Sequence, residues 1–291
     1  MRMRSLLFVP GDSERKFDRA REAGADMLIL DLEDSVAPSR KEEARAHVAG
    51  LLGNNELRSW RFFVRPNALN TGLALEDLCS VVRPGLDGLL VPKADSARDI
   101  EQIGHYLDAL EHSAGMAPGS VKIAVVATET PQAMFNLGSY VPPHPRLVGL
   151  TWGAEDLGAA IGITDNKEPD GAWTLPYKVA RAQCLFAASA AGVAPIDTLY
   201  ADFRDREGLA ADCRIARRDG FVGRIAIHPD QVETINVCFS PSESEVARAR
   251  AVVDAFAAQP EAGTVGIDGK MYDIPHLKAA RRTLQSAGED Q

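Results

Sequence analysis

Short apolar runs recur along the chain, and each is followed by a longer stretch whose apolar residues repeat at helical spacing. The run at 121–126, VKIAVV, is nearly unbroken, which is typical of a strand buried on both faces of a parallel sheet. Eight such runs are found, at 6–9, 27–32, 61–64, 88–91, 121–126, 146–151, 194–200 and 222–227. Eight strands that alternate with helices predict an α/β protein with a (β/α)8 barrel.

The helical stretches fall between these runs and continue past the last one. Asp12 or Ser13 is expected to cap the first helix, and further helices are predicted at 41–52, 73–82, 96–112, 177–191 and 207–218, with a short one after Ala154. The polar segment 162–173 reads as an exposed loop. Helices at 242–258 and 276–284 flank a turn signal, Asp268-Gly269, which predicts a hairpin or flap. We therefore expect a barrel domain at 1–240 and a helix-and-flap extension at 241–291.

Composition narrows the classes of function. The 291 residues are 45% hydrophobic and 25% charged, as in an ordinary globular protein, and a net charge of -9 argues against nucleic acid or an anionic membrane as main partner. The first nine residues are too short for a signal-peptide core, and no run approaches the length of a membrane span. The four cysteines are scattered, without metal-binding spacing. These features favour a reducing, cytoplasmic setting.

Charged residues cluster where the predicted strands end. Parallel strands of a barrel end at one face, so one mouth is expected to hold Glu33, Asp34, Arg65, Lys93, Glu129, Asp156 and His228. Two carboxylates, Glu129 and Asp156, without nearby Cys or His suit a hard cation such as Mg²⁺. Arg65 offers a planar fork for a carboxylate or thioester oxygen. The alternatives are that Asp156 caps a helix, that Arg65 pairs with Glu33 or Asp34, and that His228 is structural.

The segment 8–21, FVPGDSERKFDRAR, combines a glycine turn, a helix start and four basic residues. Such a surface can hold a phosphate group, although solvated surface arginines are the commoner explanation.

Nine segments in order along the chain, RSLLFVPGDSERKF, LILDLEDSV, FVRPN, VPKAD, TETP, GLTWGAEDLGAAIG, DTLYADFRD, GRIAIHPDQV and DGKMYDIP, resemble the citrate lyase β-subunit-like branch of the HpcH/HpaI aldolase superfamily. The resemblance implies a Mg²⁺-dependent TIM barrel that makes or breaks a carbon–carbon bond in acyl-CoA thioesters. It implies that Glu129 and Asp156 are the metal ligands and that Arg65 holds the substrate. It further implies a CoA and substrate site at Phe8, Val9, Pro10, Gly11, Asp12, Ser13, Arg15, Arg19, Glu33, Asp34, Ile227 and His228.

Asp273 in KMYDIP matches an aspartate that the family delivers from the flap of a neighbouring subunit as general acid and base. A homo-oligomer, a trimer or a multiple of it, follows from this resemblance. His228-Pro229 and the basic run look closer to free-standing citramalyl-CoA and malyl-CoA lyases than to carrier-dependent citrate lyase subunits, whereas Gln132 stands where many relatives have a small residue.

The expected activity is cleavage of a citramalyl-CoA, malyl-CoA or citryl-CoA type thioester into acetyl-CoA or propionyl-CoA and a keto acid. Three alternatives stay open: a malyl-CoA-type thioesterase, a β-subunit of a citrate lyase complex, and an aldolase acting on free keto acids. The acyl group is not fixed by the sequence.

Overall fold

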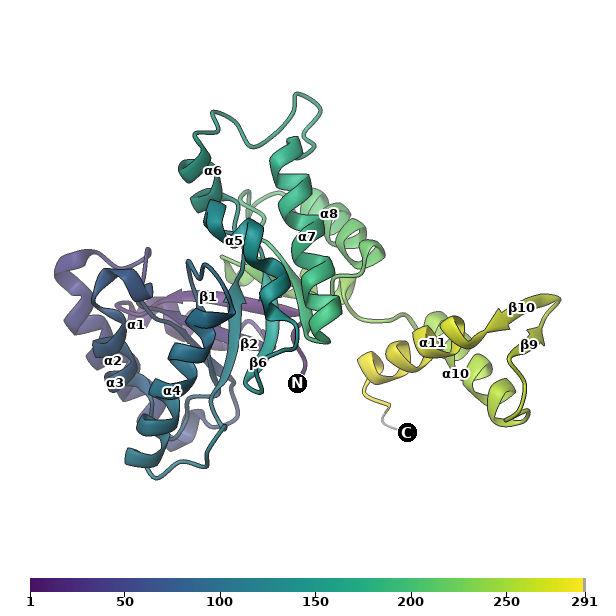
Figure 1. The fold of residues 1–291 in the computed structure, drawn as a ribbon, viewed down its shortest axis with the longest axis horizontal. Helices are drawn as coiled ribbons and strands as arrows, with labels where there is room; N and C mark the ends of the chain where they lie inside the picture. The colour runs from purple at the N-terminus through teal and green to yellow at the C-terminus, as the bar shows by residue number, and fades with distance from the viewer. Residues whose placement is uncertain (290–291) are drawn as a thin grey trace. The chain divides into compact units, whose positions relative to one another are not determined.

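The computed structural model describes residues 1–289. The chain forms two compact units, one that comprises residues 3–236 and one that begins at Val237. Each unit is described by itself, and Figure 1 traces the elements of both. No helix in the described part of the chain is long and apolar enough to cross a membrane.

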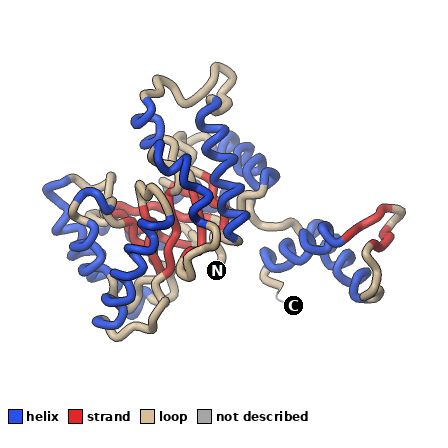
Figure 2. Tube along the Cα trace, in the orientation of Figure 1, coloured by secondary structure: helices blue, strands red, loops and turns tan. Residues whose placement is uncertain are grey.

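The first unit is a closed barrel of eight parallel strands in sequential order, so the predicted (β/α)8 fold is confirmed (Figure 2). The strands are β1 (Ser5–Pro10), β2 (Met27–Asp31), β3 (Phe62–Arg65), β4 (Gly88–Val91), β5 (Lys122–Val126), β6 (Leu147–Thr151), β7 (Ala194–Asp197) and β8 (Gly223–Ala226). The barrel closes where β1 pairs with β8, with Leu6 opposite Ile225.

Alternate residues of each strand point into the barrel, because side chains of a strand alternate between its faces. The interior is filled by Leu6, Met27, Ile29, Phe63, Leu90, Ala124, Val126, Ile196 and Ile225. Intervening residues such as Leu7, Leu28 and Leu89 are also buried, against the surrounding helices. Burial on both faces explains why the strands read as continuous apolar runs.

Helices connect the strands and cover the barrel. They are α1 (Glu14–Arg21), α2 (Lys41–Gly53), α3 (Ala74–Val81), α4 (Ala97–Ser113), α5 (Pro131–Asn136), α6 (Glu155–Ile161), α7 (Leu175–Ala191), α8 (Arg206–Asp219) and α9 (Val232–Cys238). Short 3-10 turns occur at η1 (Pro38–Arg40), η2 (Asn55–Leu57), η3 (Leu69–Thr71), η4 (Leu137–Tyr140) and η5 (Pro229–Gln231). The side chain of Ser96 caps α4 by accepting a hydrogen bond from the Arg98 amide.

Several strand ends differ from the expected ranges, and two of these ends mark buried aspartates. The second strand stops at Asp31 instead of residue 32, and the seventh stops at Asp197 instead of residue 200. Both strands end at a buried aspartate whose carboxylate is tied to arginine side chains. The residues that follow Asp197 turn toward the barrel mouth, where Thr198 and Leu199 line a cavity.

The second unit packs two helices, α10 (Glu243–Ala257) and α11 (Ile274–Ala287), with a hairpin of β9 (Thr264–Ile267) and β10 (Lys270–Asp273). The hairpin turns at Asp268-Gly269, both with positive φ, as the turn signal predicts. Its core is built by Val252, Phe256, Val265, Leu277 and Leu284, among others. The unit therefore has a hydrophobic core of its own.

Candidate active site

A cavity of about 800 Å³ opens at the carboxyl ends of the barrel strands. Its lining includes Phe8 of β1, Arg65 of β3, Leu90 of β4 and Thr151 of β6, together with Glu129 and Asp156 just beyond β5 and β6. Barrel enzymes place their chemistry at this face. The cavity is therefore the candidate active site, and all of its lining residues belong to the first unit.

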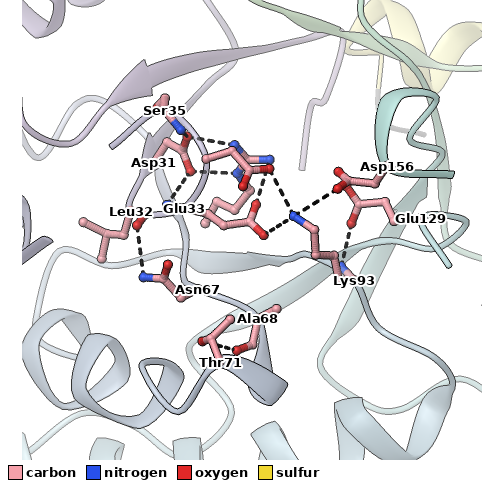
Figure 3. Close-up of polar contacts among 12 residues, drawn as sticks. Asp31, Leu32, Glu33, Ser35, Asn67, Ala68, Thr71, Lys93, Glu129 and Asp156 are labelled. Atoms are coloured by element: carbon pink, nitrogen blue, oxygen red, sulfur yellow. Dashed lines mark hydrogen bonds and ion pairs between the residues drawn. The ribbon is translucent and has the colours of Figure 1, made fainter. Parts of the chain in front are cut away.

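Lys93 joins the acidic residues of this site (Figure 3). Its backbone amide donates to Glu129 Oε2 at 2.5 Å, and its Nζ lies 2.6 Å from Glu33 Oε1, 3.1 Å from Asp34 Oδ2 and 3.3 Å from Asp156 Oδ1. Lys93 has a φ of 49°, a strained left-handed conformation for a residue with a Cβ. One residue thus directs both its backbone donor and its ammonium group toward carboxylates that follow three different strands, β2, β5 and β6.

Arg65 is held by the ion pairs of a buried network. Its Nε and Nη2 donate to the two oxygens of Asp31 at 2.7 and 2.8 Å, and its Nη1 lies 3.0 Å from Glu33 Oε2. Its guanidinium also lies over the Phe8 ring, 4.6 Å from the centroid. The predicted alternative that Arg65 pairs with Glu33 is confirmed, whereas its main partner, Asp31, is not among the partners that the sequence predicts.

The carboxylate of Asp31 is saturated with donors. Besides Arg65, it accepts hydrogen bonds from the amides of Glu33 and Ser35. Burial alone would raise the pKa of Asp31, but the hydrogen bonds and charge of Arg65 outweigh burial and keep that pKa below its usual value. Asp31 is therefore a fixed anion that orients the arginine fork, and three guanidinium nitrogens are already engaged.

Glu129 carries the clearest electrostatic signal. Burial, with a further contribution from the negative charges of Asp156 and Glu33, raises the pKa of Glu129 to about 8, although the hydrogen bond from the Lys93 amide acts in the opposite direction. A bound cation would stabilise the ionised form of a buried carboxylate that lies beside two other carboxylates. Glu129 and Asp156 offer only oxygen ligands, which suits Mg²⁺, an ion that commonly takes one or two protein carboxylates and keeps water or substrate oxygens.

Within residues 1–289, no group of three or more His, Cys, Asp or Glu side chains is arranged to hold a metal. The residues present therefore fit a two-carboxylate site. Close packing positions Glu129, because a Cβ on Gly153 would lie 2.7 Å from Glu129 Cγ.

Asp156 does not cap the helix that follows it. The N-cap position of α6 is Ala154, which makes no side-chain cap, and Asp156 lies in the first turn with its carboxylate on Lys93. The capping alternative is therefore wrong. Asp156 lines the cavity together with Glu129, as the strand-end argument requires.

The residues expected to bind CoA are spread around this mouth. Of the first helix and its approach, only Phe8 lines the cavity among the described residues, while Val9 and Gly11 are buried. Gly11 lies so close to β2 that a Cβ would meet Asp31 O at 2.6 Å. Asp12 pairs with Arg40 at 2.8 Å. Any ligand contact by Val9 or Gly11 would therefore involve backbone atoms.

Arg19, one of the outer residues of that predicted site, lines a separate, smaller groove. Pro10 and Ser13 are half-buried and Arg15 is exposed, whereas Arg19 lines a groove of about 330 Å³ with Pro229 and Asp230. Ile227 is 37% exposed, and the His228 ring stacks on Phe203 with 4.5 Å between centroids. Binding of CoA by these residues stays a prediction.

Asp273 lies in the second unit. It caps α11, where its carboxylate contacts His276 Nδ1 at 2.5 Å and accepts from the His276 amide. The hydrogen bond from His276 lowers the pKa of Asp273. Its delivery to a neighbouring subunit's site stays a prediction.

Sequence reasoning did not predict several residues that line the cavity, among them Lys167, Trp173 and Thr151. Lys167 and Trp173 lie on the polar loop after α6, which gave no sign of facing a site, and Thr151 was counted only as part of a strand. Asp31 had a usable signal, since it is a carboxylate at the end of a fully buried apolar run.

The fold and the site together define a (β/α)8-barrel protein with a pocket at the carboxyl ends of its strands, and the carboxylates of Glu129 and Asp156 line this pocket. The chain belongs to the HpcH/HpaI aldolase/citrate lyase family, whose model matches residues 4–229. The resemblance drawn from the motifs is thus confirmed at family level, while a closer kinship to citramalyl-CoA lyases stays a prediction.

The chain is similar to enzymes of two kinds. It is 35% identical to a (3S)-malyl-CoA thioesterase of Cereibacter sphaeroides (strain KD131 / KCTC 12085) over 98% of this chain and 94% of that protein. It is 33% identical to the citrate lyase subunit beta of Haemophilus influenzae over 98% and 96%. It is also similar, at 33% identity and a TM-score of 0.77, to the protein CitE of Mycobacterium tuberculosis, solved in complex with magnesium, acetoacetate and coenzyme A, with 98% of both chains covered.

Proposed function

We propose that this protein is a Mg²⁺-dependent carbon–carbon lyase that acts on a β-hydroxyacyl-CoA thioester of citramalyl-CoA, malyl-CoA or citryl-CoA type. The observation that carries the proposal is the convergence of Glu129 and Asp156 on one cavity with Arg65. The magnesium, acetoacetate and coenzyme A bound by the similar CitE support the choice of cofactor and substrate class.

The reaction breaks the bond between the carbinol carbon and the methylene beside the thioester. The hydroxyl oxygen loses its proton and becomes the keto oxygen, while the bonding electron pair passes into a thioester enolate. The enolate carbon then takes up a proton and gives acetyl-CoA, or propionyl-CoA from a methylated chain. The condensation direction reverses these steps.

The residues of the cavity divide this work. Glu129 and Asp156 would hold Mg²⁺, which when bound polarises the hydroxy or keto acid oxygens. Three guanidinium nitrogens of Arg65 are fixed by Asp31 and Glu33, and its remaining N–H groups are available to the thioester oxygen on which negative charge develops. Lys93 holds the loops in place by contacting both metal ligands.

Asp273 would exchange the proton at the reacting carbon or hydroxyl, as the resemblance implies. This role requires a neighbouring subunit, so a homo-oligomer is part of the proposal.

A thioesterase is the second candidate, and the 35% identity to a malyl-CoA thioesterase supports it. A β-subunit of a citrate lyase complex is the third, supported by 33% identity to such a subunit. The products discriminate among them: the lyase yields acetyl-CoA or propionyl-CoA with a keto acid, and the thioesterase yields free CoA with the hydroxy acid. A complex subunit would be inactive on free CoA esters.

The test is a product assay on the wild type and on Glu129→Ala and Asp156→Ala. Both variants should lose Mg²⁺-dependent turnover by at least about 10²-fold while the circular dichroism of the barrel is kept. Glu42→Ala, on the exposed face of α2, is the matched control. Retained metal-dependent activity in either variant contradicts the ligand assignment.

A further inference from the structure

The side chain of Lys93 lies beside the two proposed metal ligands and not in the cavity. Its ammonium group is 2.6 Å from Glu33 Oε1, 3.1 Å from Asp34 Oδ2 and 3.3 Å from Asp156 Oδ1. Lys93 is 23% exposed at its side chain and is not among the residues that line the cavity of the candidate active site. Lys93 is therefore placed to act on the site through its carboxylates and not by contact with a substrate.

Lys93 is the counterion of Asp156. Their contact is the only ion pair that Asp156 makes within the described residues 1–289. Arg65, another cation beside this group of carboxylates, is bound to Asp31 and Glu33. Because Asp156 is also one of the two proposed metal ligands, a metal ion and the Lys93 ammonium group are alternative cations for the same carboxylate.

Other contacts position the two ligands. The backbone amide of Lys93 donates to Glu129 Oε2 at 2.5 Å, and Glu129 also packs against Gly153. The Gly153 amide donates to Thr128 Oγ1 at 3.2 Å, which ties the segment that leads to Asp156 to the segment that follows β5. These contacts do not involve the ammonium group, so they can persist when the lysine side chain is replaced.

The backbone conformation of Lys93 allows its two roles to be separated. With a φ of 49°, its amide points at Glu129 while its side chain reaches Glu33 and Asp156 (Figure 3). Glycine adopts this left-handed conformation more readily than lysine does. Glycine at position 93 would therefore keep the amide donor to Glu129 and remove the ammonium group.

A positive charge next to a metal site opposes the entry of a second cation. Like charges a few ångströms apart repel each other, most strongly where burial limits screening by solvent and salt. Glu33 and Glu129 are only 4% and 5% exposed, so this part of the site is poorly screened. The ammonium group also contacts Asp156 directly. Both effects lower the affinity of the site for a divalent cation.

We propose that the ammonium group of Lys93 competes with Mg²⁺ for Asp156 and thereby weakens metal binding. The inference rests on the proposed function, because it takes Glu129 and Asp156 as the metal ligands. The ammonium group neutralises Asp156 when no metal is bound, and it keeps Glu33 and Asp34 as partners when a metal binds Asp156. Lys93 thus stabilises the site without metal and keeps its metal exchangeable.

The test is a calorimetric titration with Mg²⁺ alone, without keto acid or thioester, of full-length protein from which metal has been removed with EDTA. Lys93→Met removes the charge and keeps an apolar stem, so its Kd for Mg²⁺ should be roughly 10- to 100-fold lower than that of the wild type. Lys93→Gly should shift the Kd in the same direction, and Lys93→Arg should stay close to the wild type. Lys178→Met removes the same net charge from an exposed position of α7 and should leave the Kd unchanged.

Thermal melts separate this role from a purely structural one. Without Mg²⁺, Lys93→Met should have a lower Tm than the wild type, because Glu33, Asp34 and Asp156 lose their shared cation. At one fixed Mg²⁺ concentration, the rise in Tm should be larger in the variant, because the tighter ligand stabilises the folded state more. A lysine that only held the loops together would give weaker Mg²⁺ binding and a smaller rise in the variant.

The outcomes distinguish this inference from the proposed function. Tighter Mg²⁺ binding by Lys93→Met, lost again when Glu129→Ala is added, supports the inference even if no thioester is cleaved, and the lyase alone is then refuted. Equal or weaker binding by either folded Lys93 variant, while Glu129→Ala still weakens binding by the wild type, overturns the inference and leaves the lyase standing. Lys93→Gly decides alone if Lys93→Met does not fold. Mg²⁺ binding that is unaffected by Glu129→Ala would refute the ligand assignment, and the inference with it.

Discussion

Replacing Arg65 by lysine tests whether the fork geometry of this residue matters beyond its charge. Arg65 donates to Asp31 at 2.7 and 2.8 Å and contacts Glu33 at 3.0 Å, and its side chain is only 13% exposed. Hydrogen bonds between charged groups contribute about 1.5–3 kcal/mol each. Lysine reaches one carboxylate as a point charge, and one or two of the three contacts are lost.

The expected loss of unfolding free energy in Arg65→Lys is therefore about 1.5–6 kcal/mol, because the charge is kept while the bidentate geometry is not. In a unit of this size such a loss lowers the Tm by roughly 3–24 °C. Urea titration and differential scanning calorimetry measure the two quantities. We also expect kcat/KM to fall at least about tenfold at a temperature where the variant is folded, because the remaining N–H groups no longer point at the substrate.

Arg40→Lys is the matched control. Arg40 also bonds two carboxylates, Asp12 at 2.8 Å and Glu43 at 2.9 Å, but its side chain is 46% exposed. Solvent screens exposed ion pairs, which contribute little to stability, so this variant should differ little from the wild type. Equal stability of the two variants, together with unchanged kinetics for Arg65→Lys, would refute the argument; lost stability with unchanged kinetics would leave Arg65 a purely structural role.

Two predictions concern metal and assembly. The pKa of Glu129 is raised from 4.5 to about 8 in the folded protein, so between these pH values the native state binds a proton that the unfolded chain has released. The stability of the metal-free protein should therefore fall as pH rises from about 4.5 to 8. Thermal melts should show that Mg²⁺ stabilises the protein most at the alkaline end of this range, and both trends should be smaller in Glu129→Gln. Asp273→Asn keeps a good helix cap, so mixing this inactive variant with inactive Glu129→Ala should restore activity if the flap serves a neighbouring subunit; a mixture that stays inactive although subunits exchange contradicts that arrangement.

The local pattern of apolar and polar residues was sufficient to predict the barrel and to place Glu129 and Asp156 at its mouth. Eight apolar runs alternating with amphipathic stretches were sufficient to predict the barrel, because each strand that is buried on both faces is a continuous apolar run by itself. The positions of Glu129 and Asp156 followed from the same reasoning, since parallel strands end at one mouth. The Asp268-Gly269 turn needed only the preference of those two residues for positive φ.

Partner choice among charged residues was decided only by the tertiary structure. Arg65 had several acidic candidates, and the register that places Asp31 directly opposite it made Asp31 the main partner. The left-handed backbone at Lys93 is not a preference of lysine, and it exists because the surrounding loops and carboxylates hold it there. Lys167 looked like any polar loop residue until folding set it over Trp173. Periodicity reports which face of an element is buried, whereas contacts between residues far apart in the chain depend on how the elements pack.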